Sequence, residues 1–192
     1  MGSFIVGEIE ESIRTKTLLK AHEYEIEKAA KMMISSIGKG GKIMFCGNGG
    51  SAADSQHIAA ELVGKFLSKE RRALPAIALT TNTSILTAIA NDFSYEDVFE
   101  RQVRALALVN DVVVGISTSG KSKNVIRAVM AAKQMGCKTA ALTGSSGGEL
   151  AALADVCIKV PSDNTQRIQE CHILIGHILC GLVEDSITNA SS

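Results

Sequence analysis

The sequence contains no tryptophan, only two tyrosines and only two prolines among 192 residues. So few aromatic rings argue against a surface that stacks nucleic-acid bases. Twenty Lys and Arg balance twenty Asp and Glu, so the chain lacks the net positive charge typical of nucleic-acid-binding proteins. The scarcity of proline permits long uninterrupted helices, because proline breaks a helix interior. The composition therefore favours a helix-rich globular protein that does not bind nucleic acid.

Signals for export or for membrane insertion are also missing. The N-terminal segment turns acidic at Glu8 and has no basic stretch before an apolar one, unlike a signal peptide. No run approaches the ~20 apolar residues that span a bilayer. The five cysteines include no Cys-x-x-Cys pair, and most lie in apolar runs, where reduced and buried thiols are usual. We therefore expect a cytoplasmic protein without a membrane partner.

What the sequence does contain is an alternation of short apolar runs and helical patterns. Residues 8–37 have apolar positions at helical spacing, and so do residues 165–187. Between them lie five apolar runs bounded by turn residues, at 43–46, 76–79, 112–116, 139–142 and 156–160. Most of these runs are separated by helical patterns, which is the spacing of βαβ units. The sequence therefore predicts an α/β domain with a parallel sheet and a long N-terminal helical segment, without internal repeats or linkers.

Four of the five apolar runs are followed by small, hydroxyl-rich or glycine-rich segments. These segments are residues 47–51, 80–84, 117–122 and 143–148. In parallel sheets, ligands bind beyond the carboxyl ends of the strands, where loops lead into helix N-termini. Exposed backbone N–H groups and hydroxyls at such positions suit an anion. These loops predict a small phosphorylated ligand, and the alternative is that they are ordinary turns.

Two of these segments match nucleotide-binding patterns. Residues 47–52 fit G-x-G-x-x-[GA], but the acidic residue expected at the end of the next strand is missing, since Glu70 precedes that strand. Residues 115–122 fit the P-loop pattern G-x-x-x-x-G-K-[ST]. Against a P-loop, Gly115 lies inside the apolar run, and no later strand ends in a clear acidic magnesium ligand. A P-loop phosphotransferase remains an alternative.

Pairs of polar residues at helical spacing form an acid–base constellation. His57 and Glu61 are four residues apart after the first glycine-rich loop, so they share a helix face. Gln169 and His177 lie on one side of the last helix, whereas His172 points elsewhere. Imidazole, carboxylate and amide oxygen are credible zinc ligands. A carboxylate with an imidazole also suits proton shuttling between adjacent carbons, and spacing alone does not decide between these roles.

Four segments resemble the phosphoheptose isomerases, which are sugar isomerase (SIS) domain proteins. They are CGNGGSAADSQHIAAEL at 46–62, ANDF at 90–93, GISTSG at 115–120 and RIQECHILIGH at 167–177. The resemblance implies a single SIS domain over residues 1–192, in which residues 1–38 form a helical segment that packs on the domain or on neighbouring subunits. It implies a three-layer α/β sandwich of the flavodoxin-like type with a five-stranded parallel sheet, assembled as a homotetramer with sites between subunits.

The resemblance also implies an activity and a set of site residues. The reaction would be the isomerisation of sedoheptulose 7-phosphate to D-glycero-D-manno-heptose 7-phosphate through an enediol, which feeds the synthesis of nucleotide-activated heptose. Glu61 would be the general base and His177 the general acid, and zinc would fall on His57, Glu61, Gln169 and His177. The substrate would be held by Glu61 together with Asn48, Gly49, Gly50, Ser51, Asn91, Asp92, Ser117, Thr118, Ser119, Ser122 and Gln169.

A similar branch of SIS proteins is not catalytic and binds a replication initiator. That branch shares the glycine-rich and Arg-Ile-Gln-Glu segments but lacks the residues that match Glu61 and His177, both of which are present here. One departure from many isomerases is Lys65 where they have Arg; the charge is kept but the bidentate fork is lost. A second departure is Lys121, which creates the P-loop match.

Overall fold

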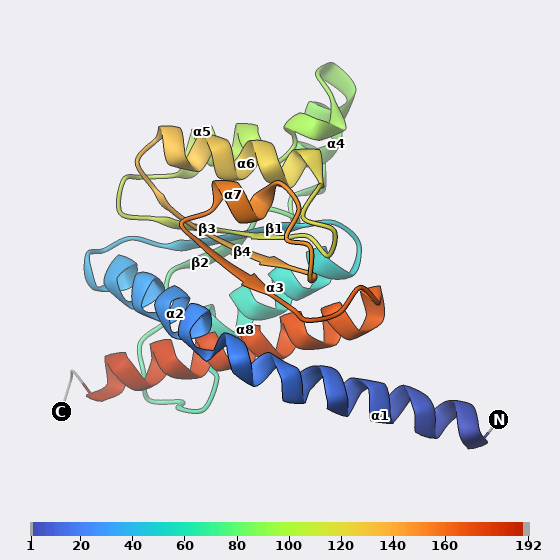
Figure 1. The fold of residues 1–192 in the computed structure, drawn as a ribbon. Coiled ribbons are helices and arrows are strands. Elements are labelled where there is room, and N and C mark those ends of the chain that lie inside the picture. Colours follow the sequence, from blue (N-terminus) through green and yellow to red (C-terminus); the bar gives the residue numbers. More distant parts are fainter. Residues whose placement is uncertain (1, 190–192) are drawn as a thin grey trace.

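The structure is a computed structural model that describes residues 2–189 as helices around one sheet (Figure 1). Its strands are β1 (Ile43–Gly47), β2 (Ala76–Ala78), β3 (Val112–Ile116), β4 (Lys138–Thr143) and β5 (Val156–Lys159). Its helices are α1 (Gly2–Leu19), α2 (Glu23–Gly38), α3 (Gly50–Val63), α4 (Thr83–Asp92), α5 (Glu100–Leu106), α6 (Lys123–Gln134), α7 (Leu150–Leu153) and α8 (Thr165–Asn189), with short 3-10 turns η1 (Lys20–His22) and η2 (Tyr95–Asp97).

All strand pairs in the sheet are parallel, and the order is β2-β1-β3-β4-β5. The five strands coincide with the five apolar runs, so the predicted five-stranded parallel sheet is confirmed. The chain moves from β1 outward to β2 and then returns past β1 to β3. The order therefore reverses between β1 and β3, which is where ligands bind in sheets of this type.

Helices cover both faces of the sheet, which explains why the strands are apolar runs rather than alternating ones. Ile43 and Phe45 point to one face and pack with side chains of α2, α3 and α8. Met44 and Cys46 point to the other face and pack with α5, α6 and α7. Figure 1 shows these two helical layers with the sheet between them. The predicted three-layer sandwich is confirmed.

We expected no membrane-spanning segment, and the longest helix, α8, is the element that bears on this expectation. By length and composition alone it could cross a membrane, with a mean hydropathy of 1.3 over its most apolar window. However, it packs against α2 and α3, and Ile168, Ile175, Leu179 and Val183 are buried in the larger core. The central helix of a packed domain passes the same test of length and hydropathy, so this result is weak evidence for a membrane span.

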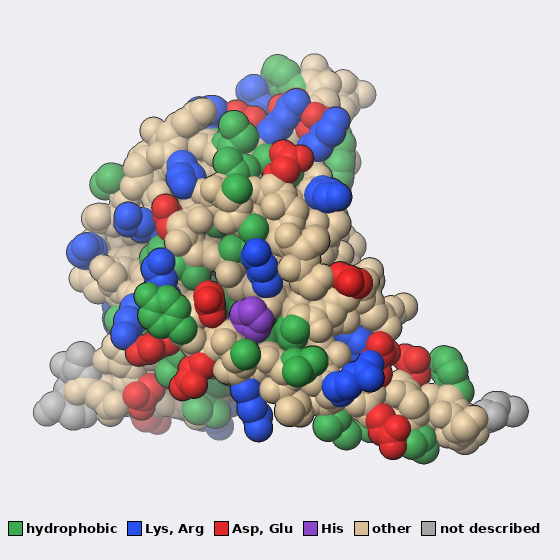
Figure 2. Space-filling model, in the orientation of Figure 1, with side chains coloured by type: hydrophobic (Ala, Val, Ile, Leu, Met, Phe, Trp, Pro, Cys, Tyr) green, Lys and Arg blue, Asp and Glu red, His purple; other side chains and the backbone are tan. Residues whose placement is uncertain are grey.

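Helix α1 projects from the sandwich as an arm (Figure 1). Only Thr15 and Leu19 of this helix are buried. Ser12 donates a 2.6 Å hydrogen bond to Glu170 of α8 and so joins the base of the arm to the domain. Figure 2 shows apolar side chains along the arm, and acidic and basic side chains are interspersed over the rest of this face.

Candidate active site

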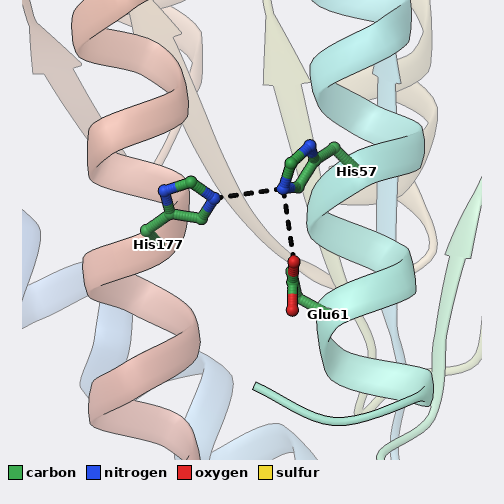
Figure 3. A group of neighbouring side chains, drawn as sticks. All are labelled: His57, Glu61 and His177. Atoms are coloured by element: carbon green, nitrogen blue, oxygen red, sulfur yellow. Dashed lines mark hydrogen bonds and ion pairs between the residues drawn. The ribbon is translucent and has the colours of Figure 1, made fainter. Parts of the chain in front are cut away.

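Three side chains meet between α3 and α8: His57, Glu61 and His177 (Figure 3). The Nε2 atoms of His57 and His177 are 3.1 Å apart, and His57 Nε2 lies 3.3 Å from Glu61 Oε1. One ligand atom from each residue lies within 4.8 Å of the others. His57 and Glu61 share a face of α3 because they are four residues apart. The cluster is open to the outside, since about half of the His57 side chain is exposed.

A glycine on α8 lets the two helices approach closely enough for this meeting. A methyl group at Gly176 would lie 2.5 Å from Ile58 Cδ1 and 2.6 Å from Ile58 Cγ1. The neighbours of these two residues are His177 and His57. The Gly176–Ile58 contact therefore sets the spacing at which the two imidazoles face each other.

The cluster fits a zinc ion. Zinc held tetrahedrally at ~2.0–2.1 Å from nitrogen and oxygen ligands separates neighbouring ligand atoms by ~3.3 Å. The two measured separations, 3.1 and 3.3 Å, match this spacing. His57 Nε2 takes part in both contacts, as a corner of the tetrahedron would. Two imidazoles and one carboxylate would also leave a fourth position for another ligand.

Gln169, the fourth residue in the predicted ligand set, lies at a different level of the helix pair. A side chain at Gly50 would collide with the Gln169 amide, which places this amide against the first turn of α3. His57 is seven residues further along α3, a rise of about 10 Å. The structure therefore brings three of the four predicted ligands together and puts Gln169 beside the glycine-rich loop.

The glycine-rich loop after β1 is tied to the first turn of α6 by side-chain amides. Asn48 and Asn124 exchange hydrogen bonds of 2.9 and 2.8 Å, and the Tyr95 hydroxyl donates to Asn48 Oδ1 at 3.1 Å. Gly49 has a positive φ of 56°, a conformation that glycine adopts most easily. Gly50 and Ser51 begin α3, with Ser51 buried. The predicted segment 48–51 thus lies where the strand order reverses.

Tyr95 and Asn124 were not predicted from the sequence. Asn124 follows the hydroxyl-rich segment 117–122 by two residues, and Tyr95 follows ANDF at 90–93 by two, so proximity to these motifs was the available signal. Asn91 and Asp92 themselves end α4, where the Asn91 amide donates to Asp92 at 2.8 Å.

Two hydroxyl-rich loops line a small pocket at the same edge of the sheet. The pocket has a volume of about 160 Å³ and is bordered by Thr118 and Ser119 from one loop and by Ser145 and Ser146 from the next. Beside it, the hydroxyls of Ser117 and Ser122 are 2.8 Å apart. The Ser119 hydroxyl accepts only a local hydrogen bond, from Lys121 N–H. Asp163 also borders the pocket and accepts a hydrogen bond from the Ser145 hydroxyl, so Thr118 and Ser119 are the hydroxyls of this pocket that could meet an anion.

Asp54 is a titratable group beside the cluster that was not predicted. It precedes His57 by three residues on α3, and its Oδ2 atom is buried without a hydrogen-bond partner among the described residues. Burial raises the pKa of this carboxyl to about 6, although the charge of His57 acts in the opposite direction. Burial of a single side chain has no signature in sequence spacing, which explains why Asp54 was missed.

His172 lies outside the cluster, as its helical angle predicts. The side chain is fully buried, and its Nε2 atom is 3.2 Å from the Thr143 carbonyl oxygen. Burial lowers the pKa of His172 to about 4, although the hydrogen bond to Thr143 acts to raise it. A neutral, buried imidazole bonded to the end of β4 has a structural role.

The P-loop pattern has another explanation in the structure. Gly115 lies within β3, and a methyl group there would be 2.7 Å from Val125 Cγ1 on α6. The first glycine of the pattern therefore allows close packing between strand and helix, and it does not form part of a phosphate-binding loop.

Comparisons with known proteins agree with this geometry. The SIS domain family model matches residues 10–144. A phosphoheptose isomerase from Nitratiruptor is 57% identical over 174 residues, which cover 89% of this chain and 92% of that protein. The structure of a phosphoheptose isomerase from Neisseria gonorrhoeae superposes with a TM-score of 0.90 at 46% identity, covering 96% of this chain and 98% of that one.

A second solved structure, a phosphoheptose isomerase from Francisella tularensis, gives a TM-score of 0.92 at 40% identity and covers 95% of this chain and 97% of that one. Because these matches have high identity and coverage, they argue against the three other interpretations: a dinucleotide-binding protein, a P-loop phosphotransferase and a non-catalytic SIS protein. The chain belongs to the phosphoheptose isomerases of the SIS domain family and is a phosphosugar isomerase.

Proposed function

We propose that the protein interconverts sedoheptulose 7-phosphate and D-glycero-D-manno-heptose 7-phosphate, a step toward nucleotide-activated heptose. The observation that carries this proposal is the meeting of Glu61 with His177 and His57 on the open side of the α3–α8 pair. A carboxylate and an imidazole within reach of one small ligand can move protons between adjacent carbons and oxygens. The relatives at 46–57% identity are phosphoheptose isomerases by name.

In the proposed mechanism Glu61 removes a proton from the carbon beside the ketose carbonyl, and His177 protonates the carbonyl oxygen. The product of these two transfers is an enediol of the sugar. Glu61 then returns its proton to the neighbouring carbon while His177 takes the proton of the other hydroxyl, which gives the aldose. Both groups are restored, as a cycle requires.

The sugar phosphate would lie between the two loops at the carboxyl edge of the sheet. We assign its phosphate to the hydroxyls of Ser117, Thr118, Ser119 and Ser122, because they belong to one loop, of which Thr118 and Ser119 line the pocket and Ser117 bonds to Ser122. Asn48, Gly49, Gly50, Ser51 and Gln169 surround the start of α3 and would hold the sugar between this phosphate and Glu61. Asn91 and Asp92 are further proposed contacts.

We also propose that one zinc ion binds each chain. His57, Glu61 and His177 would hold it. Gln169, the fourth ligand that the resemblance implies, lies beside Gly50 in this chain, away from these three residues. When bound, zinc polarises the oxygens of the substrate as a Lewis acid. Glu61 serves the proton transfer only while its carboxylate is free to accept a proton.

The assembly we propose is a homotetramer in the cytoplasm. Phe4, Ile5, Val6, Ile9 and Ile13 of α1 are between 53% and 70% exposed, and apolar faces of this kind are usually covered by another chain. Beside the arm, an apolar groove of about 720 Å³ lies between α2 and α8 and is lined by Leu19, Ile26, Leu174, Ile178 and Leu182. A second copy offers the matching helix face.

Turnover of sedoheptulose 7-phosphate by the Glu61→Gln variant tests the proposal. Glutamine keeps the shape of the side chain and cannot accept the proton, so kcat should fall ~10²–10⁴-fold while substrate still binds. In heavy water the wild-type product should carry deuterium at the carbon beside the carbonyl. The matched control is Glu100→Gln, which breaks a comparable (i, i+4) pair with Arg104 on α5. Wild-type turnover by Glu61→Gln would assign the base to another group.

Metal content tests the zinc proposal separately. His57→Ala should lose the metal that the wild type contains, and His22→Ala, which changes a histidine on η1, should keep it. Treatment with a chelator should lower turnover, and zinc should restore it. Full turnover by the metal-free protein would show that the cluster acts by proton transfer alone.

A further inference from the structure

A buried carboxylate on α8 holds the loop that connects α3 to β2. Glu184 is 3% exposed. It accepts hydrogen bonds from the backbone N–H groups of Phe66, Leu67 and Ser68 at 3.1, 2.7 and 2.8 Å. It also pairs with Arg71, whose Nε donates to the same carboxylate. Four donors from one loop thus converge on a single side chain, seven residues beyond His177 on the same helix.

Arg71 connects this carboxylate to the helix that carries the proposed base. Its side chain is 2% exposed, and its Nη2 donates a 2.7 Å hydrogen bond to the backbone carbonyl of Glu61. Glu61 lies near the end of α3, where carbonyl groups have no partner within the helix. Arg71 therefore fixes the backbone of Glu61 and is itself fixed by Glu184.

Phe66 connects the same loop to the proposed acid. Its ring stacks on the His177 imidazole, with 5.8 Å between ring centroids and 26° between ring planes. The ring also lies near a second residue of α8: a methyl group at Gly181 would be 3.4 Å from Phe66 Cε1. The ring therefore packs on the imidazole whose Nε2 faces His57.

We propose that Glu184 is a positioning residue for the isomerisation: through the loop it places Phe66 on His177, and through Arg71 it holds the backbone of Glu61. This inference rests on the proposed roles of Glu61 and His177. These hydrogen bonds also act on the pKa of Glu184. Burial alone would raise the pKa of this carboxyl, but the bonds from Arg71 and the three N–H groups outweigh it and lower the pKa to about 2.

The chain offers a matched control in another loop, the one that leads into the amino end of β3. Asp111 is 1% exposed and accepts backbone N–H groups of Lys42 and Leu108 at 2.9 and 2.7 Å. It also forms an ion pair with the Lys42 side chain at 2.5 Å. Asp111 thus performs the same structural task as Glu184, but it lies before the amino end of β3, away from the cluster.

The experiment compares Glu184→Gln with Asp111→Asn in melting temperature, kcat and KM. Both variants should melt at lower temperature than the wild type. Only Glu184→Gln should lower kcat, by ~10–100-fold as for other residues that orient a catalytic or ligating group, with KM within about twofold of the wild type. Phe66→Leu, which keeps apolar bulk without a flat ring, should lower kcat in the same way. Equal kcat values for all three variants and the wild type would overturn the proposal.

A readout that needs no substrate separates this proposal from the proposed function. In spectra of protein labelled at its four histidines, Glu184→Gln and Phe66→Leu should shift the ring signals of His177 and leave those of His22 in place. Asp111→Asn should shift neither. Unchanged His177 signals in both site variants would overturn the positioning role, even if the wild type isomerises the sugar. Shifted signals in a protein without heptose turnover would instead count against the substrate alone.

Discussion

At the scale of the residue, the proposed phosphate site consists of the hydroxyls after β3. Ser117 and Ser122 bond to each other, and Ser119 makes only a local bond to Lys121 N–H. Glycine at position 120 supplies the positive φ of 65° that turns the loop back toward the next one. Because Ser119 bonds only within its own loop, its contribution should appear in substrate affinity.

Ser119→Ala tests this contribution. The lost hydrogen bond to a charged group is worth ~1.5–3 kcal/mol, so KM for the sugar phosphate should rise roughly 10- to 100-fold while kcat changes little. Ser35→Ala, at an exposed position of α2, is the control and should leave both constants unchanged. A Ser119→Ala enzyme with wild-type KM would place the phosphate elsewhere. Micromolar binding of ATP that Lys121→Ala abolishes would also contradict the assignment and revive the P-loop interpretation.

The residues of the candidate site, in the cluster and around it, differ in how far the sequence predicts them. His57 and Glu61 follow from an (i, i+4) spacing on one helix, which is a local property. Tyr95 and Asn124 contact Asn48 from positions 47 and 76 residues away, and no local pattern predicts such contacts. Asp54 was missed for a related reason, because its burial depends on what packs over α3.

At the scale of the element, α8 carries two glycines that differ in their surroundings. Gly176 lies against Ile58, whereas a methyl group at Gly181 would meet Phe66 only at an ordinary contact distance of 3.4 Å. Alanine is a better helix former than glycine by ~1 kcal/mol. The two positions on one helix therefore separate helix propensity from packing.

Gly176→Ala and Gly181→Ala should change stability in opposite directions. At Gly181 the helical preference acts alone, so the free energy of unfolding should rise by up to ~1 kcal/mol. At Gly176 overpacking costs ~1–3 kcal/mol, which should outweigh that gain, and displacement of His177 should lower turnover. Denaturant unfolding and kinetic assays of both variants measure these effects. Equal stability of the two variants would show that Ile58 moves aside without cost.

At the scale of the whole molecule, the arm formed by α1 is the part that the single chain leaves uncovered. Ile9 and Ile13 are 55% and 59% exposed on this helix. If a second copy covers them, light scattering should give a native mass four times the 20.2 kDa of the chain. The double variant Ile9→Glu, Ile13→Glu should have a smaller mass and lower turnover, because the resemblance places sites between subunits.

The control for this prediction is Val109→Glu, an apolar side chain that is 66% exposed in the loop before β3. It should keep the native mass of the wild type. A wild-type protein that is monomeric at micromolar concentration would contradict the proposed homotetramer. Such a result would leave the α1 face to another partner.

The sequence by itself determined the strands, most of the helices and the shared edge of the sheet at which the polar loops lie. Apolar runs of four or five residues, separated by helical patterns, specify a parallel sheet because each run must be buried on both faces. The polar loops after these runs then share one edge, since all parallel strands end on the same side. The periodicity of residues 8–37 also predicted helix there, and the structure divides this segment into α1 and α2, with α1 beginning at Gly2.

Only the tertiary structure decided which helix faces meet. His177 and His57 are 120 residues apart, and their meeting depends on the packing of Gly176 against Ile58. The same packing places Gln169 beside Gly50, two turns from the cluster, and brings Glu184 under the loop of Phe66 and Arg71. Helical periodicity fixes the direction of each side chain around its own axis. The contact between two helices depends on the shapes of both surfaces, and one sequence segment does not contain that information.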